Sequence, residues 1–270
     1  MSVSASYEFD QENQDADSEL ARLRVQTLIS WEREARLLGW LGLRDGLNVI
    51  ELGSGPGFVT EQLLHGLPTS PITALDADRE MLTRAAQYLG GVDDGRVTYV
   101  PASVTDTGLP DNTYDFAIAR YLFQHLTDPL AAAKETLRLL KPGGKLAIID
   151  IDAALWGIVE PTFPQLQAIY AKTGQARRGG NRRIGRRLWR TLQAAGFVNV
   201  ELEAFVYHSD DLGLEPFLPQ LDPNRLLRSL KSDQISLSEY ATAHALYHKF
   251  QAAPDAYVLM VGLIACGEKG

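Results

Sequence analysis

The sequence predicts an α/β fold in which helices cover both faces of a mainly parallel β-sheet. Between residues 47 and 151, short apolar runs alternate with segments of helical periodicity. The first run enters a loop with glycine at every second position, and two further apolar runs occur in the last third of the chain. Strands that alternate with helices form βαβ units, whose strands are parallel and lie buried between helices.

The elements follow in order from their residues. Residues 1–17 are polar and acidic, and we expect them to form a flexible N-terminal arm. From Ser18 to Leu41 the apolar residues recur at helical spacing, which predicts one or two amphipathic helices. The alternating part then predicts strands at 47–52, 71–75, 97–101, 114–119 and 145–151, and helices at 59–64, 79–89 and 129–140.

The last third has a different pattern. A helix is predicted at 184–195, and strands at 197–207 and 256–266 lack a βαβ helix between them, which favours an antiparallel pair at the sheet edge. Residues 153–181 and 209–252 are predicted to form a helical lid. The main domain then comprises residues 18–152, 182–208 and 253–270.

The composition argues against several classes of protein. The 270 residues carry a formal net charge of −8 with an isoelectric point near 5.2, which disfavours general attraction to nucleic acid or anionic membranes. No apolar run approaches the ~20 residues that cross a bilayer, and residues 1–17 lack the pattern of a signal peptide. Cys266 is the single cysteine, so no internal disulfide can form. We therefore expect a cytoplasmic protein with no membrane partner.

The glycine loop is the most informative segment. An apolar strand enters a loop with Gly53, Gly55 and Gly57, and a helix follows. Glycine permits the tight turn and the close approach of a ligand, and the helix start offers unpaired N–H groups. Asp76 ends the next predicted strand, where a carboxylate can accept hydrogen bonds from ribose hydroxyls. The alternative is that the glycines only form a turn and Asp76 caps the next helix.

The spacing within the loop disfavours a dinucleotide. The dinucleotide pattern requires glycine or alanine at its sixth position, so that helix and strand pack closely. Counted from Gly53, this position is Phe58. A nucleoside cofactor other than NAD or FAD is therefore favoured.

Four segments resemble motifs of the class I S-adenosylmethionine-dependent methyltransferases. Glu51–Gly57 matches the first motif, an acid followed by G-x-G-x-G, and Leu75–Asp78 matches the second. Leu109–Asp115 is similar to the "LPFPDNSFD" stretch, and Lys141–Gly144 to the "LKPGG" turn. The resemblance covers residues 45–155 well. It implies a Rossmann-like, seven-stranded, mostly parallel sheet with an antiparallel last strand, plus a helical lid, and S-adenosylmethionine as cofactor.

The resemblance also implies a set of cofactor-binding residues. The glycines would let the methionine portion lie against the backbone, and Glu51 would face its amino group. Asp76 would bind the ribose, and Ser103 stands where the family often has an acid for the adenine, so it would accept that hydrogen bond more weakly. The full set is Glu51, Gly53, Ser54, Gly55, Gly57, Asp76, Ala77, Ser103, Val104, Ala119 and Arg120.

A second, looser likeness concerns the acceptor. Residues 180–197 resemble a subset of these enzymes that act on small metabolites and insert helices before the final strand. We therefore expect methyl transfer to O, N or activated C of a small-molecule acceptor, which requires mainly alignment for in-line displacement. Two alternatives stay open: a methyltransferase that acts on RNA or protein, and a cofactor-binding protein without activity. The sequence also leaves open whether the protein forms a homodimer.

Histidines are the candidate general bases. His125 follows the fourth strand of the alternating part, at the edge where the methyl group would point, and His208 lies at the end of the next-to-last strand. Each could instead be structural. His244 and His248 have the i, i+4 spacing of zinc ligands on a helix, but no Glu or cysteine pattern accompanies them, so we expect no metal.

Two further groups of charged residues stay ambiguous. Asp150 and Asp152 end the strand at 145–151, where they contact either a substrate or only the backbone. A basic cluster could recognise a carboxylate or phosphate, or form a solvated surface that pairs with acids. The cluster consists of Arg177, Arg178, Arg182, Arg183, Arg186, Arg187 and Arg190.

Overall fold

The structure is a computed structural model, and it describes residues 16–155, 157–173 and 180–270. The expected N-terminal arm lies outside these ranges except for Ala16 and Asp17, which begin the first helix. None of the helices within the described residues is both long enough and apolar enough to cross a membrane.

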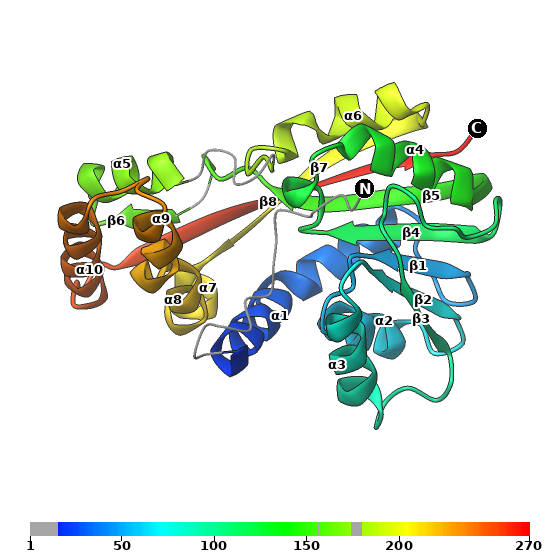
Figure 1. The fold of residues 1–270 in the computed structure, drawn as a ribbon, viewed down its shortest axis with the longest axis horizontal. Coiled ribbons are helices and arrows are strands. Elements are labelled where there is room, and N and C mark those ends of the chain that lie inside the picture. The colour runs from blue at the N-terminus through cyan, green and yellow to red at the C-terminus, as the bar shows by residue number, and fades with distance from the viewer. Residues whose placement is uncertain (1–15, 156, 174–179) are drawn as a thin grey trace.

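Among the described residues, eight strands form one sheet, in the order β3-β2-β1-β4-β5-β8-β6, and β7 pairs with β8 beside this path (Figure 1). The first five strands are parallel, and the last strand of the chain runs antiparallel to each of its partners. The predicted mostly parallel sheet with an antiparallel last strand is confirmed. The strands are β1 (Val49–Leu52), β2 (Ile72–Asp76), β3 (Val97–Pro101), β4 (Tyr114–Arg120), β5 (Leu140–Ile151), β6 (Gly157–Glu160), β7 (Val198–His208) and β8 (Tyr257–Glu268).

The predicted count of seven strands is wrong because of β6. This short strand lies in the segment that was expected to be purely helical. The last strand is 12 residues long, and β5 pairs only with its part from Gly262 to Glu268. The edge of Tyr257–Leu259 is thereby left open, and β6 pairs with it. Buried backbone N–H and C=O groups without hydrogen-bond partners are costly, and β6 supplies such partners to this end of the last strand.

Helices cover both faces of the sheet, as predicted. In Figure 1, α4 and α6 lie on one side, and α1, α2 and α3 lie on the other. The helices of this part are α1 (Ala16–Trp40), α2 (Phe58–Gly66), α3 (Arg79–Leu89), α4 (Pro129–Leu139) and α6 (Leu188–Ala195). Short 3-10 helices are η1 (Phe123–His125) and η2 (Gly185–Arg187), so the helix predicted at 184–195 begins with a tighter turn.

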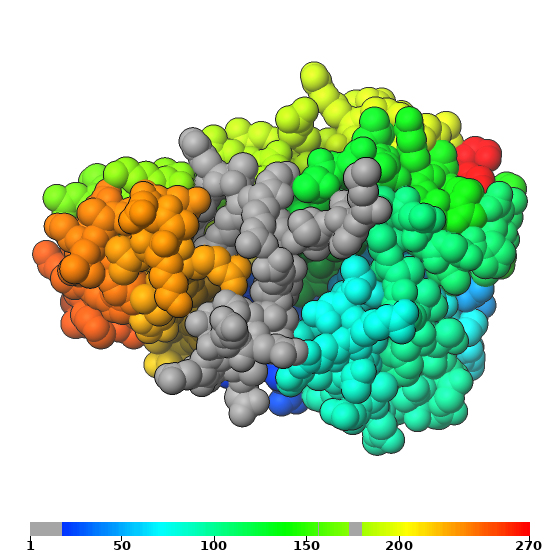
Figure 2. All heavy atoms as spheres, in the orientation of Figure 1, coloured from blue at the N-terminus to red at the C-terminus, as the bar shows by residue number. Residues whose placement is uncertain are grey.

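The remaining helices gather at one end of the molecule, where β7 and β8 extend beyond the parallel strands (Figure 1). We refer to this group, together with β6, as the cap; its helices lie at the left of the space-filling view (Figure 2). The cap residues Phe217, Tyr247 and Phe250 belong to the same apolar core as the α1 side of the sheet. Its helices are α5 (Pro164–Thr173), α7 (Ser209–Leu212), η3 (Glu215–Phe217), α8 (Leu218–Leu221), η4 (Pro223–Leu226), α9 (Leu227–Lys231) and α10 (Leu237–Gln251).

Candidate functional site

The glycine loop joins the end of β1 to the start of α2. Gly53, Gly55 and Gly57 have φ angles of 71°, 54° and 88°, a region that side chains disfavour. The N–H groups of Gly53 and Ser54 both donate to the carbonyl of Leu75, at 2.7 and 3.0 Å. The loop is thereby fixed to the end of the neighbouring β2.

The loop leaves space and unused polar groups for a ligand. A Cβ added at Gly55 would meet no atom within 4 Å. The Oγ of Ser54 is buried and has no hydrogen-bond partner within the described residues. An open stretch of backbone beside an unpartnered hydroxyl fits the polar methionine portion of S-adenosylmethionine.

Asp76 ends β2 beside this loop. One carboxylate oxygen accepts the N–H of Gly55 and the other accepts the N–H of Asp78, both at 2.8 Å. Burial raises the pKa of Asp76. The cap of α3 is Asp78, which accepts from the N–H groups of Glu80 and Met81. The alternative in which Asp76 caps that helix is therefore wrong, and lone pairs of its carboxylate stay available for ribose hydroxyls.

Glu51 lies beneath the loop rather than on its surface. It is 2% exposed, and its Oε2 accepts a hydrogen bond of 2.6 Å from the hydroxyl of Thr60 on α2. Burial raises the pKa of Glu51 to about 8. This carboxyl joins the end of β1 to the first turns of the helix that follows the loop.

The other predicted cofactor residues lie at the carboxyl ends of the neighbouring strands. Ala77 is exposed directly after β2. Ser103 follows β3, with its Oγ 2.9 Å from the Oγ1 of Thr105, while Val104 and Ala119 are buried in the core. The side chains at these positions therefore differ in their access to a ligand.

Arg120, at the end of β4, binds α1. Its Nε and Nη2 contact the carboxylate of Glu34 at 2.6 and 3.0 Å, and the side chains are 6% and 0% exposed. Nη2 also donates to the carbonyl of Gln26 at 2.9 Å and lies 3.3 Å from the Oγ of Ser30. The sequence did not reveal this pair, because 86 residues separate its members.

His125 lies in η1, close to the same edge of the sheet. The preceding Gln124 donates its N–H to Asp150 at 2.9 Å, and its carbonyl accepts the N–H of Asn181. Burial raises the pKa of Asp150 to about 7. The structure thus assigns Asp150 a backbone-anchoring role beside His125.

His208 ends β7 and contacts the ring of Tyr257, with 5.9 Å between the centroids. Its Nδ1 is buried without a hydrogen-bond partner among the described residues. Successive side chains of a strand alternate between faces, so the buried Tyr207, and not His208, shares the face of Phe205.

Tyr207 and Tyr121 interact through their hydroxyl groups. Sequence reasoning missed both tyrosines, because the sequence carries no signal for this pairing.

The other charged candidates contact different parts of the structure. Arg186 pairs with the fully buried Asp152, while Arg177 and Arg178 lie outside the described residues. His244 contacts the ring of Tyr240, with 4.6 Å between the centroids. In the part of the chain that the structure describes, no group of three potential ligands could hold a metal ion.

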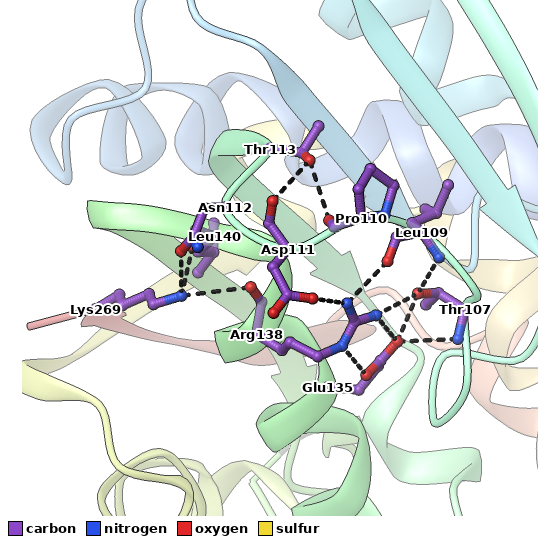
Figure 3. Close-up of polar contacts among 10 residues, drawn as sticks. All are labelled: Thr107, Leu109, Pro110, Asp111, Asn112, Thr113, Glu135, Arg138, Leu140 and Lys269. Atoms are coloured by element: carbon purple, nitrogen blue, oxygen red, sulfur yellow. Dashed lines mark hydrogen bonds and ion pairs between the residues drawn. The ribbon is translucent and has the colours of Figure 1, made fainter.

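The 109–115 stretch lies at the opposite end of β4 from Arg120. Figure 3 shows Arg138 of α4 at the centre of this region, where it pairs with Glu135 and Asp111 and donates to the carbonyl of Leu109 at 2.8 Å. Lys269 donates to the Oδ1 of Asn112 at 2.8 Å. These contacts fix the connection into β4 and the C-terminal end of the chain.

A cavity of about 350 Å³ lies next to the glycine loop. Asp76 is absent from its lining, so this cavity is separate from the expected ribose position. Its lining residues are Leu20, Pro56, Phe58, Arg84, Gln87 and Tyr88.

Comparison with known families gives a match to the methyltransferase domain model over residues 50–148. This range contains most of β1 and of β5, the glycine loop and Asp76. The chain carries a class I methyltransferase domain. S-adenosylmethionine is the cofactor of this class, and hence of the domain.

Each of two curated relatives matches less than half of this chain. A ubiquinone/menaquinone biosynthesis C-methyltransferase UbiE from Shewanella woodyi is 33% identical over 112 residues, which cover 40% of this chain and 44% of the relative. A demethylmenaquinone methyltransferase from Chlamydia pneumoniae is 28% identical over 134 residues, covering 47% and 55%. The match thus spans about half the length of these relatives.

Solved structures extend the likeness of fold to the whole chain. Phosphoethanolamine N-methyltransferase 2 from Haemonchus contortus, in complex with phosphomonomethylethanolamine and S-adenosylhomocysteine, has a TM-score of 0.61 at 19% identity. The match covers 99% of this chain and 60% of that one. A complex of the Trm112 methyltransferase activator with a methyltransferase from Haloferax volcanii has a TM-score of 0.59 at 17% identity, with 99% of both chains covered.

Proposed function

We propose that this chain transfers the methyl group of S-adenosylmethionine to an oxygen, nitrogen or activated carbon of a small molecule. The observation that carries the proposal is the open glycine loop at Gly55 with the Asp76 carboxylate hydrogen-bonded beside it. Both lie at the carboxyl ends of parallel strands, where α/β folds bind their ligands.

The chain's own residues would bind and align the reactants. Asp76 would accept hydrogen bonds from the ribose, and the loop backbone, supported from beneath by Glu51, would contact the methionine portion. The bound cofactor supplies an electrophilic methyl group on a sulfonium. Holding the acceptor atom in line with that group, within roughly 3–3.5 Å, removes much of the barrier. His125 would accept the proton of a hydroxyl or amine acceptor.

Several features support a small acceptor. The chain is acidic overall, and the cap places aromatic residues such as Phe217 and Tyr247 on the α1 side of the sheet. Relatives of the domain are named as C-methyltransferases of quinone biosynthesis, and a structural neighbour as an N-methyltransferase. We accordingly keep both carbon and heteroatom acceptors in the proposal.

The first test is calorimetric titration with S-adenosylmethionine and, separately, with NADH. We expect micromolar binding of S-adenosylmethionine and a loss of at least about tenfold in Asp76→Ala, because the ribose contacts disappear. Asp78→Ala is the matched control, since this neighbouring carboxylate caps α3. Binding of NADH alone would overturn the proposed cofactor use.

A second test addresses the acceptor. The protein is incubated with methyl-labelled S-adenosylmethionine and separate fractions of small metabolites, RNA and protein. Label in the metabolite fraction is the expected result. Label in RNA or protein would instead support a macromolecular acceptor, and cofactor binding without transfer to any fraction would support a non-catalytic protein.

A further inference from the structure

Tyr121, the first residue after β4, has an unusual backbone conformation. Its φ is 52°, in the left-handed region that bulky residues rarely adopt. Its N–H donates to the carbonyl of Ile149 on β5 at 2.8 Å, which fixes this conformation. Residues held in such conformations concentrate at functional sites.

The segment that contains Tyr121 lies against the glycine loop. The side chain of Leu122 covers Gly53 so closely that a Cβ there would lie 2.9 Å from its Cδ1. Arg120, on the other side, ends β4 at the carboxyl edge of the sheet. Tyr121 is therefore next to the loop that is proposed to hold the methionine portion of the cofactor.

Two neighbours hold the Tyr121 side chain in place. The guanidinium carbon of Arg120 lies 4.4 Å from the ring centroid, and Glu34 holds Arg120 in turn. Tyr207 contacts Tyr121 through its hydroxyl. The Tyr207 ring is 4% exposed and stacks between Phe205 and Phe217, with centroid distances of 6.1 and 6.0 Å.

This tyrosine pair retains hydrogen-bonding capacity. Each hydroxyl has one proton to donate and two lone pairs, and the contact between them uses one proton. Tyr207 is buried and Tyr121 is partly exposed, so Tyr121 is the more accessible member of the pair.

We propose that the Tyr121 hydroxyl, supported by Tyr207, hydrogen-bonds an oxygen atom of the methyl acceptor and orients the acceptor toward the methyl donor. The ligand class is a molecule with a hydroxyl group on a ring or enol. Arg120 and Glu34 act as positioning residues behind the Tyr121 ring. This inference rests on the proposed methyltransferase function.

The test uses 4-nitrophenol, a chromophoric phenol, as the probe. It is titrated into the protein saturated with S-adenosylhomocysteine, and absorption and calorimetry report its binding. We expect Tyr121→Phe to weaken probe binding about tenfold, as for the loss of one hydrogen bond to a partly charged group, with a smaller effect in Tyr207→Phe. Tyr114→Phe is the control, because it removes a hydroxyl that contacts Thr73 in the core at 3.2 Å.

The outcomes separate this inference from the proposed function. Equal probe affinity in wild type and Tyr121→Phe, with normal S-adenosylhomocysteine binding in both, would overturn the role of Tyr121. So would a wild-type complex with S-adenosylhomocysteine that does not bind the phenol. If wild type binds neither S-adenosylmethionine nor S-adenosylhomocysteine, the proposed function fails, and the inference with it.

Discussion

At the scale of single residues, Gly55 and Gly57 show two different reasons for glycine in one loop. Both have positive φ angles, which cost other residues about 1–2 kcal/mol. A Cβ at Gly57 would also lie 3.1 Å from the Cβ of Ala85 on α3, whereas a Cβ at Gly55 meets open space. Gly57 thus permits the packing of two elements, and Gly55 leaves room for a ligand.

Substitution by alanine should separate these two roles. Gly55→Ala is expected to lower the free energy of unfolding by about 1–2 kcal/mol and to abolish most S-adenosylmethionine binding. Gly57→Ala is expected to cost about 2–4 kcal/mol, because the packing clash adds to the strain. Urea unfolding and calorimetry measure the two effects. Equal stability losses, with cofactor binding retained in Gly55→Ala, would contradict this assignment.

At the scale of elements, α1 joins the parts of the molecule around the site. It packs against α2 on one side and against β7, α8 and η3 on the other. Arg22 donates to Gln220 of the cap at 2.8 Å, and the Glu34–Arg120 pair fixes the helix to the end of β4. A buried ion pair stabilises weakly by itself, but loss of one partner leaves a buried unpaired charge.

The α1 pair can be tested by comparing single and double substitutions. Glu34→Ala is expected to lower the free energy of unfolding by about 3–5 kcal/mol, since Arg120 would stay buried without its partner. The double change Glu34→Leu with Arg120→Met should cost clearly less. Asp211→Asn is the control. It removes the charge that pairs with Arg33 of α1 in a more exposed ion pair, and it should change the free energy of unfolding by about 0–1 kcal/mol. A double variant as unstable as Glu34→Ala would contradict the argument.

At the scale of the whole molecule, buried acids make stability depend on pH. Burial raises the pKa of Glu51 to about 8 and that of Asp150 to about 7, from ordinary values of 4.5 and 3.8. The folded state therefore binds more protons than the unfolded state from about pH 4 to pH 8. Glu135 acts in the opposite sense: Arg138 and Thr107 lower its pKa from 4.5 to about 2, so its stabilisation is lost progressively as the pH falls between these values.

We accordingly expect the free energy of unfolding to decrease as the pH rises from 5 to 8. Glu51→Gln should make this decrease less steep, by up to about 1.4 kcal/mol per pH unit. The folded and unfolded states would then no longer differ by the proton that the Glu51 carboxyl binds. Urea unfolding at several pH values measures the slope. Glu203→Gln, on the exposed part of β7, is the control, and an unchanged slope in Glu51→Gln would show that the buried acid is not responsible.

The sequence predicted most elements of this fold because their signals are local. The helix at 79–89 and the strand at 97–101 were placed within their observed bounds, since periodicity and capping act over a few residues. The extra strand β6 was missed, because it exists only where the last strand leaves an open edge. The sequence alone could not show how far that strand extends beyond β5.

The candidate site was likewise predicted from the sequence only in part. By itself the sequence determined the strand, the glycine loop and the acid at the end of β2, because the turn needs positive φ angles and a ligand needs nearby backbone. Only the tertiary structure decided that Arg120 binds Glu34 and that Tyr121 contacts Tyr207. These partners are far apart in the chain, and only the packing of α1 and β7 against the end of β4 brings them together.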